Sequence, residues 1–423
     1  MELTFFPASL SGTVTAPPSK SEAHRRMICA GLTRGTVELS GYRASGDTEA
    51  TARCLSALGA RLSLQEDTLQ ITGYAQKPAL VPVYDCGESG STLRFFVPLA
   101  LALTHGGIFR MHGRLSQRPM DVYRELFVPR GVLWRMSVGA DGAAELRVTG
   151  GMEAGDFVLP GDVSSQFVSG LMFAMPMLEG NSTLTVRPPV ESIGYIRLTV
   201  QALRDSGIEV EQTGEYSWRI PGRQSYQAAS CALRGDWSQA AVLLCMGALA
   251  GEVTVTGLEP DSLQGDRAIV DCLERMGAAI TARPDGVTIR QSALHGVELD
   301  LRDTPDIGPI LALACQLAEG KSLLHGCGRL RLKESDRLNE TISMLNALGG
   351  HVELQGDTLA IEGAAQLRGG VSLPPIQDHR MVMLASAAAV AADAPITVSG
   401  AESLAKSWPD YLSVYRALGG KVE

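Results

Sequence analysis

One short phrase, a leucine or methionine followed by glycine at the end of an apolar helical pattern, recurs along the whole chain. The clear copies are Leu58-Gly59, Met276-Gly277, Leu348-Gly349 and Leu418-Gly419, and looser copies are Arg130-Gly131 and Ser206-Gly207. The copies are spaced by roughly 70 residues, and similarity at a fixed period defines an architecture before any single motif does. We therefore expect six copies of one structural repeat.

Each copy predicts the same order of elements. An apolar helix comes first, at residues 27–32, 93–103, 167–178, 240–250, 310–318 and 381–391. The glycine phrase then closes a second helix as a C-cap. After the first five glycine phrases comes a short alternating strand, at residues 67–73, 144–150, 216–222, 285–290 and 357–363, whereas the sixth copy ends the chain before its strand. The repeat reads strand, helix, strand, helix, strand, strand, and its first helix is apolar nearly all round, which predicts burial on every side.

Six such repeats exceed one hydrophobic core, so the 423 residues predict two similar domains of three repeats each. The fold class is α/β, or α+β by some schemes. The break is expected near the Gly/Gln/Ser stretch at residues 221–229. Similar halves suggest a cleft between them, where small-molecule sites usually lie. The alternative is a non-catalytic repeat scaffold for protein contacts.

Composition narrows the possible partners and compartments. With 46 acidic and 37 basic residues and a net charge of -9, broad binding to nucleic acid or an anionic membrane is disfavoured. The most apolar stretches, 95–104 and 381–392, are shorter than a bilayer span, and the first residues lack the features of a secretory signal. The eight cysteines form no C-x-x-C pair. We expect no metal, buried free thiols and a cytoplasmic protein.

Polar phrases interrupt the apolar pattern where the chain enters helices. In residues 17–25, Ser19 or Ser21 can cap a helix, and Ser21 and Arg25 share one face beside Lys20. Cations at a helix N-terminus, where the dipole already favours anions, indicate a phosphate site. An ordinary cap with solvated basic residues is the alternative.

Three further phrases have related chemistry. Residues 85–94 form a Gly/Ser turn in which glycine lets backbone N–H groups approach an oxyanion, and Arg118 adds a cation before a helix. Ser164, Ser165 and Gln166 open another apolar helix and would suit a phosphate oxygen and a ring hydroxyl. Taken alone, the turn is weak evidence and Arg118 favours a surface arginine, whereas the phrase at Ser164 is equally consistent with an ordinary helix cap.

The densest phrase is residues 329–338, where Lys333 and Arg337 stand four apart and favour an anion held by both. Glu334 beside them can donate or accept a proton, and Asp306 is either an N-cap or a base. Together the cations at helix entrances suggest a cleft for a small substrate with several anionic groups; they are Lys20, Arg25, Arg118, Lys333, Arg337, Arg380 and Lys406.

In this order the phrases resemble the 5-enolpyruvylshikimate-3-phosphate synthase family, also called 3-phosphoshikimate 1-carboxyvinyltransferase, over essentially the whole chain. The resemblance implies one domain at 14–226 and another at 227–423 joined by residues 1–13, each of three βαβαββ repeats, with the active site in the interdomain cleft. It implies transfer of the enolpyruvyl group of phosphoenolpyruvate to the 5-hydroxyl of shikimate 3-phosphate, with release of phosphate, on the route to chorismate and the aromatic amino acids. No metal or organic cofactor is implied.

The resemblance also implies roles for individual residues. Asp306 would be the base and Glu334 the acid, with Lys20 touching both substrates. Shikimate 3-phosphate would be held by Lys20, Ser21, Arg25, Ser164, Ser165, Gln166, Ser192, Asp306 and Lys333. Phosphoenolpyruvate would be held by Lys20, Gly90, Arg118, Gln166, Arg337, Arg380 and Lys406. Fixed cations in a water-poor site would offset the repulsion between two phosphates and two carboxylates.

The chain departs from the family pattern in places. Glu88-Ser89 stands where many members have Asn-Ala, and Arg329 where others have an asparagine that contacts shikimate. Gly90 is retained, which suggests sensitivity to glyphosate. The nearest rival is the sister enzyme acting on UDP-N-acetylglucosamine, and Lys20-Ser21 with Lys333-Glu334 fits the shikimate enzyme better. We expect a monomer.

Overall fold

The computed structural model describes residues 1–74 and 80–423. Chain contacts divide them into two units. The terminal unit consists of Met1–Pro17 with Arg234–Glu423, and the central unit consists of Pro18–Leu233. The sequence prediction placed the boundaries after residues 13 and 226.

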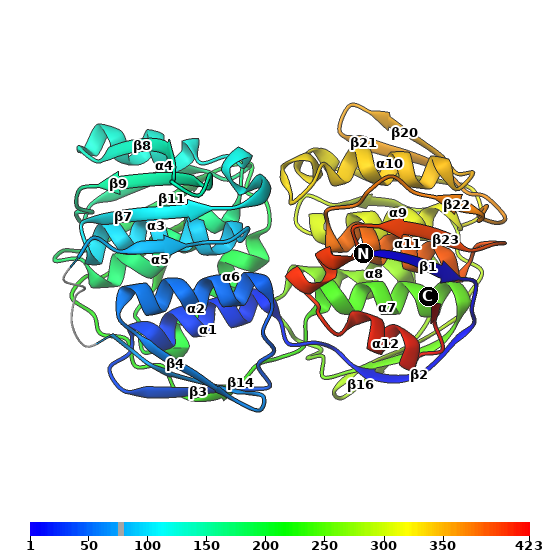
Figure 1. The fold of residues 1–423 in the computed structure, drawn as a ribbon, viewed down its shortest axis with the longest axis horizontal. Coiled ribbons are helices and arrows are strands. Elements are labelled where there is room, and N and C mark those ends of the chain that lie inside the picture. The colour runs from blue at the N-terminus through cyan, green and yellow to red at the C-terminus, as the bar shows by residue number, and fades with distance from the viewer. Residues whose placement is uncertain (75–79) are drawn as a thin grey trace. The chain divides into compact units, whose positions relative to one another are not determined.

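Each unit contains three four-stranded sheets built from the same repeat (Figure 1). If the strands of a repeat are numbered along it, their order across every sheet is first, second, fourth, third. The first two strands are parallel, as β6 and β7 are, and the others pair antiparallel, as β7, β9 and β8 do. Where the two parallel strands follow one another along the chain, a helix connects them, as a parallel connection requires. The predicted α/β class and βαβαββ repeat are confirmed.

The central unit holds the first three repeats. The first is β14 (Cys231–Ala232), α1 (Lys20–Leu32), β3 (Thr36–Ser40), α2 (Gly46–Leu58), β4 (Arg61–Gln65) and β5 (Thr68–Thr72). The second is β6 (Val83–Asp85), α3 (Gly90–Leu103), β7 (Gly106–Met111), α4 (Asp121–Phe127), β8 (Leu133–Val138) and β9 (Ala144–Thr149). The third is β10 (Asp156–Pro160), α5 (Ser165–Ala174), β11 (Ser182–Arg187), α6 (Ile193–Asp205), β12 (Glu211–Gly214) and β13 (Ser217–Ile220).

The terminal unit holds the other three. The fourth is β2 (Leu10–Thr15), α7 (Trp237–Ala250), β15 (Gly251–Thr256), α8 (Ile269–Arg275), β16 (Ala279–Arg283) and β17 (Gly286–Arg290). The fifth is β18 (Glu298–Asp300), α9 (Gly308–Gln316), β19 (Lys321–His325), α10 (Arg337–Ala347), β20 (His351–Gln355) and β21 (Thr358–Glu362). The sixth is β22 (Val371–Ser372), α11 (His379–Val390), β23 (Ile396–Ser399), α12 (Tyr411–Ala417), β24 (Lys421–Val422) and β1 (Glu2–Phe6).

Three repeats take a strand from a distant part of the chain. The sixth, which lacks its last strand in sequence order, receives β1 from the N-terminus, paired with both β23 and β24. β2 pairs with β15 to complete the fourth repeat, and β14 pairs with β3 to complete the first. The N-terminal segment therefore supplies one strand to each of two sheets in the terminal unit.

The first helix of each repeat forms the core, as its apolar sequence predicts. Every described residue of α11 is buried, and all but one residue of α7 are. Figure 1 shows α7, α9 and α11 in the interior of the terminal unit, with strands outside them. A glycine with positive φ, between 74° and 109°, follows the second helix of each repeat; these glycines are Gly59, Gly131, Gly207, Gly277, Gly349 and Gly419. Gly59 is the C-cap of α2, Gly131 is the C-cap of the 3-10 helix η2 (Val128–Arg130) that follows α4, and the other four stand one residue after the C-cap. A glycine thus stands at the predicted places, although it is itself the C-cap of only one second helix, and glycine adopts this backbone without strain.

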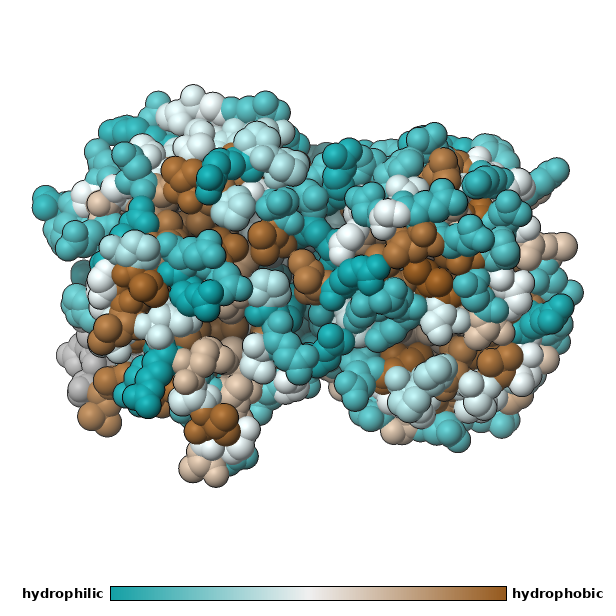
Figure 2. All heavy atoms as spheres, turned by 90° about the horizontal axis from the view of Figure 1, so that it is seen from above, coloured by the Kyte–Doolittle hydropathy of each residue, from teal (hydrophilic) through white to brown (hydrophobic). Residues whose placement is uncertain are grey.

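The face of the molecule in Figure 2 is mainly polar. Figure 2 shows a largely hydrophilic face on which hydrophobic residues form small, separate patches. The longest described helices, α3 and α7, have 14 residues, and no described helix is long and apolar enough to cross a membrane. All eight cysteines are free, and six of them are buried, as the sequence predicts.

Candidate active site

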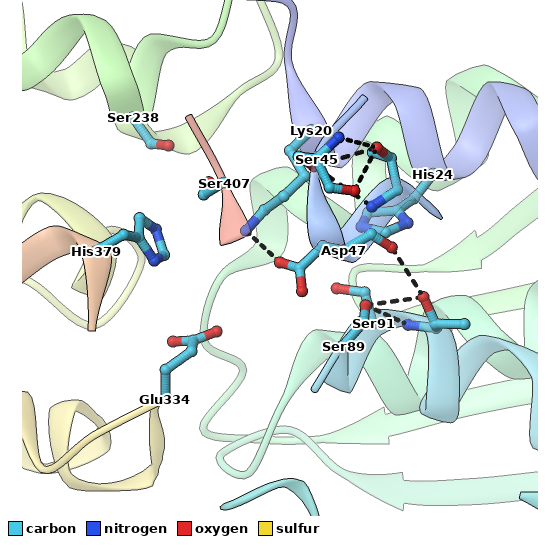
Figure 3. A network of polar contacts seen from close by, with 12 residues as sticks. Lys20, His24, Ser45, Asp47, Ser89, Ser91, Ser238, Glu334, His379 and Ser407 are labelled. Carbon is cyan, nitrogen blue, oxygen red and sulfur yellow. Dashed lines mark hydrogen bonds and ion pairs between the residues drawn. The ribbon is translucent and has the colours of Figure 1, made fainter. Parts of the chain in front are cut away.

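Lys20 stands at the start of α1, directly after the N-cap Ser19, whose hydroxyl accepts a hydrogen bond from the backbone of Glu22. Its Nζ lies 2.7 Å from Oδ2 of Asp47, and both side chains are mostly buried. Asp47 is in the first turn of α2, which a capping box between Ser45 and Thr48 fixes. The Lys20–Asp47 pair therefore joins the N-termini of two helices (Figure 3).

Arg25 is almost fully buried on the same face of α1 as Ser21. Its guanidinium donates to the backbone oxygens of Ser21 (2.7 Å) and Tyr195 (2.9 Å) and to the hydroxyl of Thr199 (2.8 Å). Burial lowers the pKa of Arg25 to about 10. Every hydrogen-bond acceptor of Arg25 is neutral, so its positive charge is not balanced by a bonded carboxylate.

Gly90 is the first residue of α3 and follows the N-cap Ser89. A side chain at Gly90 would collide with Arg118, because an added Cβ would lie 2.3 Å from Nη1 and 2.7 Å from Cζ. Arg118 itself follows the short 3-10 helix η1 (Gly113–Gln117). The absent side chain thus lets an arginine reach the positive end of a 14-residue helix, an arrangement that favours an anion.

Ser164, Ser165 and Gln166 lie at the N-terminus of α5. Ser164 is the N-cap, with its hydroxyl accepting from the backbone of Gln166 (3.3 Å). The amide of Gln166 is held at both ends, since Oε1 accepts from Arg94 (2.6 Å) and Nε2 donates to Ser91 (2.8 Å). These two bonds fix which way the amide points.

Ser192 is buried and adopts the left-handed conformation, with φ of 58°, immediately before α6. Serine rarely adopts this backbone, so it stores strain that the surrounding structure must hold. The next turn of α6 contains Tyr195, whose carbonyl holds Arg25. The start of α6 therefore positions both Ser192 and the carbonyl group that holds Arg25.

The terminal unit contains a compact cluster of charges around Arg337, the first residue of α10. Arg337 is only 1% exposed and bonds three carboxylates: Asp306 at 2.8 Å, Glu334 at 2.6 Å and Asp378 at 2.7 Å. Lys333 lies 3.0 Å from Asp306. Lys333 and Arg337 do share an anion, as their spacing predicts, and in this structure that anion is Asp306.

Asp306 does not cap a helix. It lies in η5 (Pro305–Ile307), and no side chain caps either η5 or α9. Burial favours its neutral form, but Lys333, Arg380 and Arg337 outweigh burial and hold the pKa of Asp306 below its ordinary value. Asp306 is therefore ionised at neutral pH.

The same cluster sets the pKa values of its other members. Burial lowers the pKa of Lys333, against the attraction of Asp306. For Arg337 burial acts in the same direction, but Asp378, Glu334 and Asp306 raise its pKa above the ordinary value. Arg337 is the fixed positive centre of the cluster.

Arg380 extends the cluster from the first turn of α11. Its guanidinium donates to the hydroxyl (2.7 Å) and backbone oxygen (3.1 Å) of Ser238, and its Nε lies 3.9 Å from Asp306. Asp378 caps α11 by accepting from the backbone of Arg380 (2.9 Å). Lys406 ends the 3-10 helix η7 (Ala401–Lys406) in the same unit and is partly exposed.

The predicted site residues thus form two groups, one in each unit. The central group is Lys20, Ser21, Arg25, Gly90, Arg118, Ser164, Ser165, Gln166 and Ser192. The terminal group is Asp306, Lys333, Glu334, Arg337, Arg380 and Lys406. In the described part of the chain, no group of three histidine, cysteine or carboxylate side chains is placed to hold a metal ion.

The prediction missed residues that hold the others in place. Asp47 pairs with Lys20, Arg94 orients Gln166, Asp378 anchors Arg337 and Ser238 anchors Arg380. Arg94 belongs to the phrase 85–94 that the sequence singles out, and Asp378 stands two residues before the predicted Arg380, but neither position reveals the partner. For Asp47, the signal was the capping sequence from Ser45 to Thr48.

The family model for EPSP synthase (3-phosphoshikimate 1-carboxyvinyltransferase) matches residues 6–415. The chain belongs to the EPSP synthase family. It is 38% identical over 421 residues to the 3-phosphoshikimate 1-carboxyvinyltransferase of Clostridium botulinum, covering 98% of this chain and 96% of that protein. The protein of the same name from Clostridioides difficile is 36% identical over 431 residues, with coverage of 100% and 98%.

Solved structures have the same fold as this EPSP synthase family member. EPSP synthase from Acinetobacter baumannii matches with a TM-score of 0.80 at 23% identity, covering 100% of this chain and 99% of that one. The enolpyruvyl transferase NikO from Streptomyces tendae also has a TM-score of 0.80, at 20% identity, with coverage of 100% and 98%. The family assignment therefore agrees with the resemblance found in the sequence, and the UDP-N-acetylglucosamine enzyme is not favoured.

Proposed function

We propose that this chain transfers the enolpyruvyl group of phosphoenolpyruvate to the 5-hydroxyl of shikimate 3-phosphate and releases phosphate, on the route to chorismate and the aromatic amino acids. The observation that carries the proposal is the family match over residues 6–415, supported by relatives named for this reaction. The buried cations of both groups suit two substrates that each carry a phosphate and a carboxylate.

Shikimate 3-phosphate is held mainly by the central group, through Lys20, Ser21, Arg25, Ser164, Ser165, Gln166 and Ser192, with Asp306 and Lys333 from the terminal group. Arg25 supports this assignment because all its hydrogen-bond acceptors are neutral, so an anion adds a charge partner without displacing a carboxylate. The fixed amide of Gln166 offers a defined polar group beside these serines.

Phosphoenolpyruvate is held by Lys20, Gly90, Arg118, Gln166, Arg337, Arg380 and Lys406. The approach of Arg118 to the N-terminus of α3 supports a phosphate there. Among the described residues, four of the five N–H groups of Arg337 bond Asp306, Glu334 and Asp378, which leaves one on Nη1 for the carboxylate of phosphoenolpyruvate. Substrate binding then adds an anion to a cation that carboxylates already hold in place.

The chemistry needs one proton acceptor and one proton donor. Asp306 accepts the proton of the 5-hydroxyl while the hydroxyl oxygen bonds to C2 of phosphoenolpyruvate. Glu334 protonates the C3 methylene. The resulting tetrahedral intermediate loses phosphate from C2 and a proton from the new methyl group. A carboxylate held by three cations is a weak base, and anionic substrates that engage those cations raise its pKa toward a useful value.

The reaction site lies between domains 14–226 and 227–423 with 1–13, and the domains close around shikimate 3-phosphate. The protein acts as a cytoplasmic monomer without cofactor. The division of the predicted residues between two units supports a site assembled from both. Small-angle scattering with and without shikimate 3-phosphate tests closure, which requires a smaller radius of gyration in its presence.

The decisive experiment incubates the purified protein with phosphoenolpyruvate and shikimate 3-phosphate and measures released phosphate. Release that requires both substrates is expected. A parallel reaction with UDP-N-acetylglucosamine in place of shikimate 3-phosphate should release none, and release only in that reaction identifies the sister enzyme. Binding of both substrates without release in either reaction would favour a non-catalytic scaffold.

Gly90 extends the proposal to inhibition. Because it leaves space beside Arg118, we expect glyphosate to compete with phosphoenolpyruvate. Activity that is unchanged at glyphosate concentrations far above that of phosphoenolpyruvate would contradict this.

A further inference from the structure

A buried chain of side-chain hydrogen bonds runs through the central unit from α1 to the start of α3. Nδ1 of His24 lies 2.7 Å from Oγ1 of Thr51, which lies 2.8 Å from Oγ1 of Thr92. Thr92 then donates to Oγ of Ser89 at 2.8 Å. All four side chains are at most 2% exposed. Figure 3 shows two of them, His24 and Ser89, in one view with the Lys20–Asp47 pair.

The number of hydrogens available fixes which group donates in each of these hydrogen bonds. A hydroxyl has a single hydrogen, and that of Thr92 has two acceptors, Oγ of Ser89 at 2.8 Å and the more distant backbone oxygen of Asp47 at 3.5 Å. The bond between Thr51 and Thr92 must therefore be donated by Thr51. Since the hydrogen of Thr51 is used there, Nδ1 of His24 must carry the hydrogen of the first bond. Donation runs from His24 to Ser89.

The imidazole of His24 suits this role because it stays neutral. Burial, with further contributions from Lys20 and Arg25 against that of Asp47, lowers its pKa to about 3. A neutral imidazole has one hydrogen, and it is on Nδ1. Nε2 is then a buried acceptor, and within the described residues it has no hydrogen-bond partner.

In the last member, Ser89, the hydroxyl oxygen accepts hydrogen bonds, but the hydroxyl hydrogen is not donated to any described residue. Oγ accepts from both the backbone N–H (3.3 Å) and the hydroxyl of Thr92. Among the described residues, no acceptor takes the hydrogen of Ser89. Ser89 is the N-cap of α3 and precedes Gly90, beside which Arg118 lies.

We propose that Ser89 donates a hydrogen bond to the phosphate of phosphoenolpyruvate at the N-terminus of α3, and that His24 is a positioning residue that fixes this donation through Thr51 and Thr92. The inference rests on the proposed function, because it names a further contact at the same anion site. With Thr51 bound to His24, the hydrogen of Thr92 is directed at Ser89, and Ser89 can only donate outward.

The test compares Ser89→Ala and Ser89→Thr in steady-state kinetics with each substrate varied. Loss of a hydrogen bond to a charged oxygen should raise the KM for phosphoenolpyruvate at least about tenfold in Ser89→Ala, while the KM for shikimate 3-phosphate changes less than about twofold. Ser89→Thr keeps a hydroxyl and the helix cap and should restore most of the affinity. A change below twofold in the KM for phosphoenolpyruvate in Ser89→Ala would overturn the proposal.

The positioning role of His24 is tested with His24→Leu, His24→Asn and Thr51→Val. His24→Leu and Thr51→Val should each raise the KM for phosphoenolpyruvate about three- to tenfold, whereas Asn can donate in place of Nδ1 and should stay near wild type. Thr104→Val removes a hydroxyl at the other end of α3 and should change neither KM. Equal losses for both substrates in His24→Leu would indicate a merely structural role.

Nitrogen NMR of the wild-type protein provides a measurement that does not depend on variants. We expect His24 to show the neutral Nδ1–H form at pH 7, and the Nε2–H form would overturn the direction of the chain. If wild-type protein releases no phosphate, the proposed function fails. If wild type is active and Ser89→Ala equals it, this inference alone fails.

Discussion

The two groups of site residues carry their charge in different ways. In the terminal group, three cations and three carboxylates interlock: Lys333, Arg337 and Arg380 with Asp306, Glu334 and Asp378. In the central group, Lys20 pairs with the carboxylate of Asp47, and among the described residues Arg25 bonds hydroxyls and backbone carbonyls. Around Arg337, three carboxylates balance three cations, whereas Arg25 in the central group relies on neutral hydrogen-bond partners.

The difference shows two ways to keep a buried cation ready for an anion. A charge surrounded by carboxylates is stable without substrate, but an incoming anion competes with the partners that the charge already has. A charge held by hydroxyls and carbonyls costs more to bury, but it gains a whole ion pair when the anion arrives. The proposed base lies in the first kind of environment, where substrate can change its pKa.

The largest expected effect concerns stability. Arg337→Met should destabilise the fold by about 3–5 kcal/mol, because it leaves buried carboxylates without their cation. Arg25→Met should cost less, about 1–3 kcal/mol, because only neutral groups lose a partner. Urea unfolding of both variants measures this. The double variant Arg337→Met/Asp378→Leu should recover part of the loss, and equal costs for the two single variants would break the comparison.

The next effect concerns turnover. Asp306→Ala and Glu334→Gln should each lower kcat at least about a hundredfold while substrate binding persists. Asp300→Asn is the matched control, since Asp300 in the same unit pairs with Arg302 on the surface. Phosphate release and equilibrium binding distinguish the two properties. A purified variant with near-normal turnover has no acid or base role at the substituted position.

A smaller effect is expected at Gly90. In Gly90→Ala the new Cβ must push the Arg118 guanidinium aside, which a flexible side chain tolerates without unfolding. The KM for phosphoenolpyruvate should rise about tenfold with little change in Tm or in the KM for shikimate 3-phosphate. Gly151→Ala, where the nearest atom would be 3.5 Å away, is the control. Equal losses for both substrates would contradict a phosphoenolpyruvate site there.

At neutral pH the smallest effect belongs to His24, because its contribution changes only on the acid side of the stability curve. In the unfolded chain His24 takes up a proton near pH 6.5, but in the fold only near pH 3, so protonation favours the unfolded state between these values. Stability from this group is complete above pH 6.5 and falls by at most about 1.4 kcal/mol per pH unit below it. His24→Asn should remove that slope. Identical pH profiles for variant and wild type, from urea unfolding, would show that His24 protonates freely in the fold.

Local signals made most of the fold predictable. The glycines that end the second helices and the apolar first helices are properties of short segments, and their structures follow from helix geometry. The places of β1, β2 and β14 could not be read from a period, because each leaves its neighbours in sequence to pair with a strand of another region.

In the site, too, the positions that depend on local sequence could be predicted and the long-range partners could not. Lys20, Gly90, Ser164 and Arg337 stand at helix N-termini that the sequence announces. Their partners do not, since Asp47 is 27 residues from Lys20 and Asp378 is 41 residues from Arg337. The sequence around such a carboxylate does not show which distant cation it pairs with in the fold.

The pairing of β1 with β24 has a consequence for synthesis on the ribosome. Residues 18–233 form a unit without the N-terminal segment, whereas β1 and β2 have no partners until residues 234–423 are made. At about 5–20 residues per second, those residues take on the order of 10–40 seconds to emerge. During that time the first strand, with Leu3 and Phe5 that are later buried, waits unpaired in front of an already folded unit.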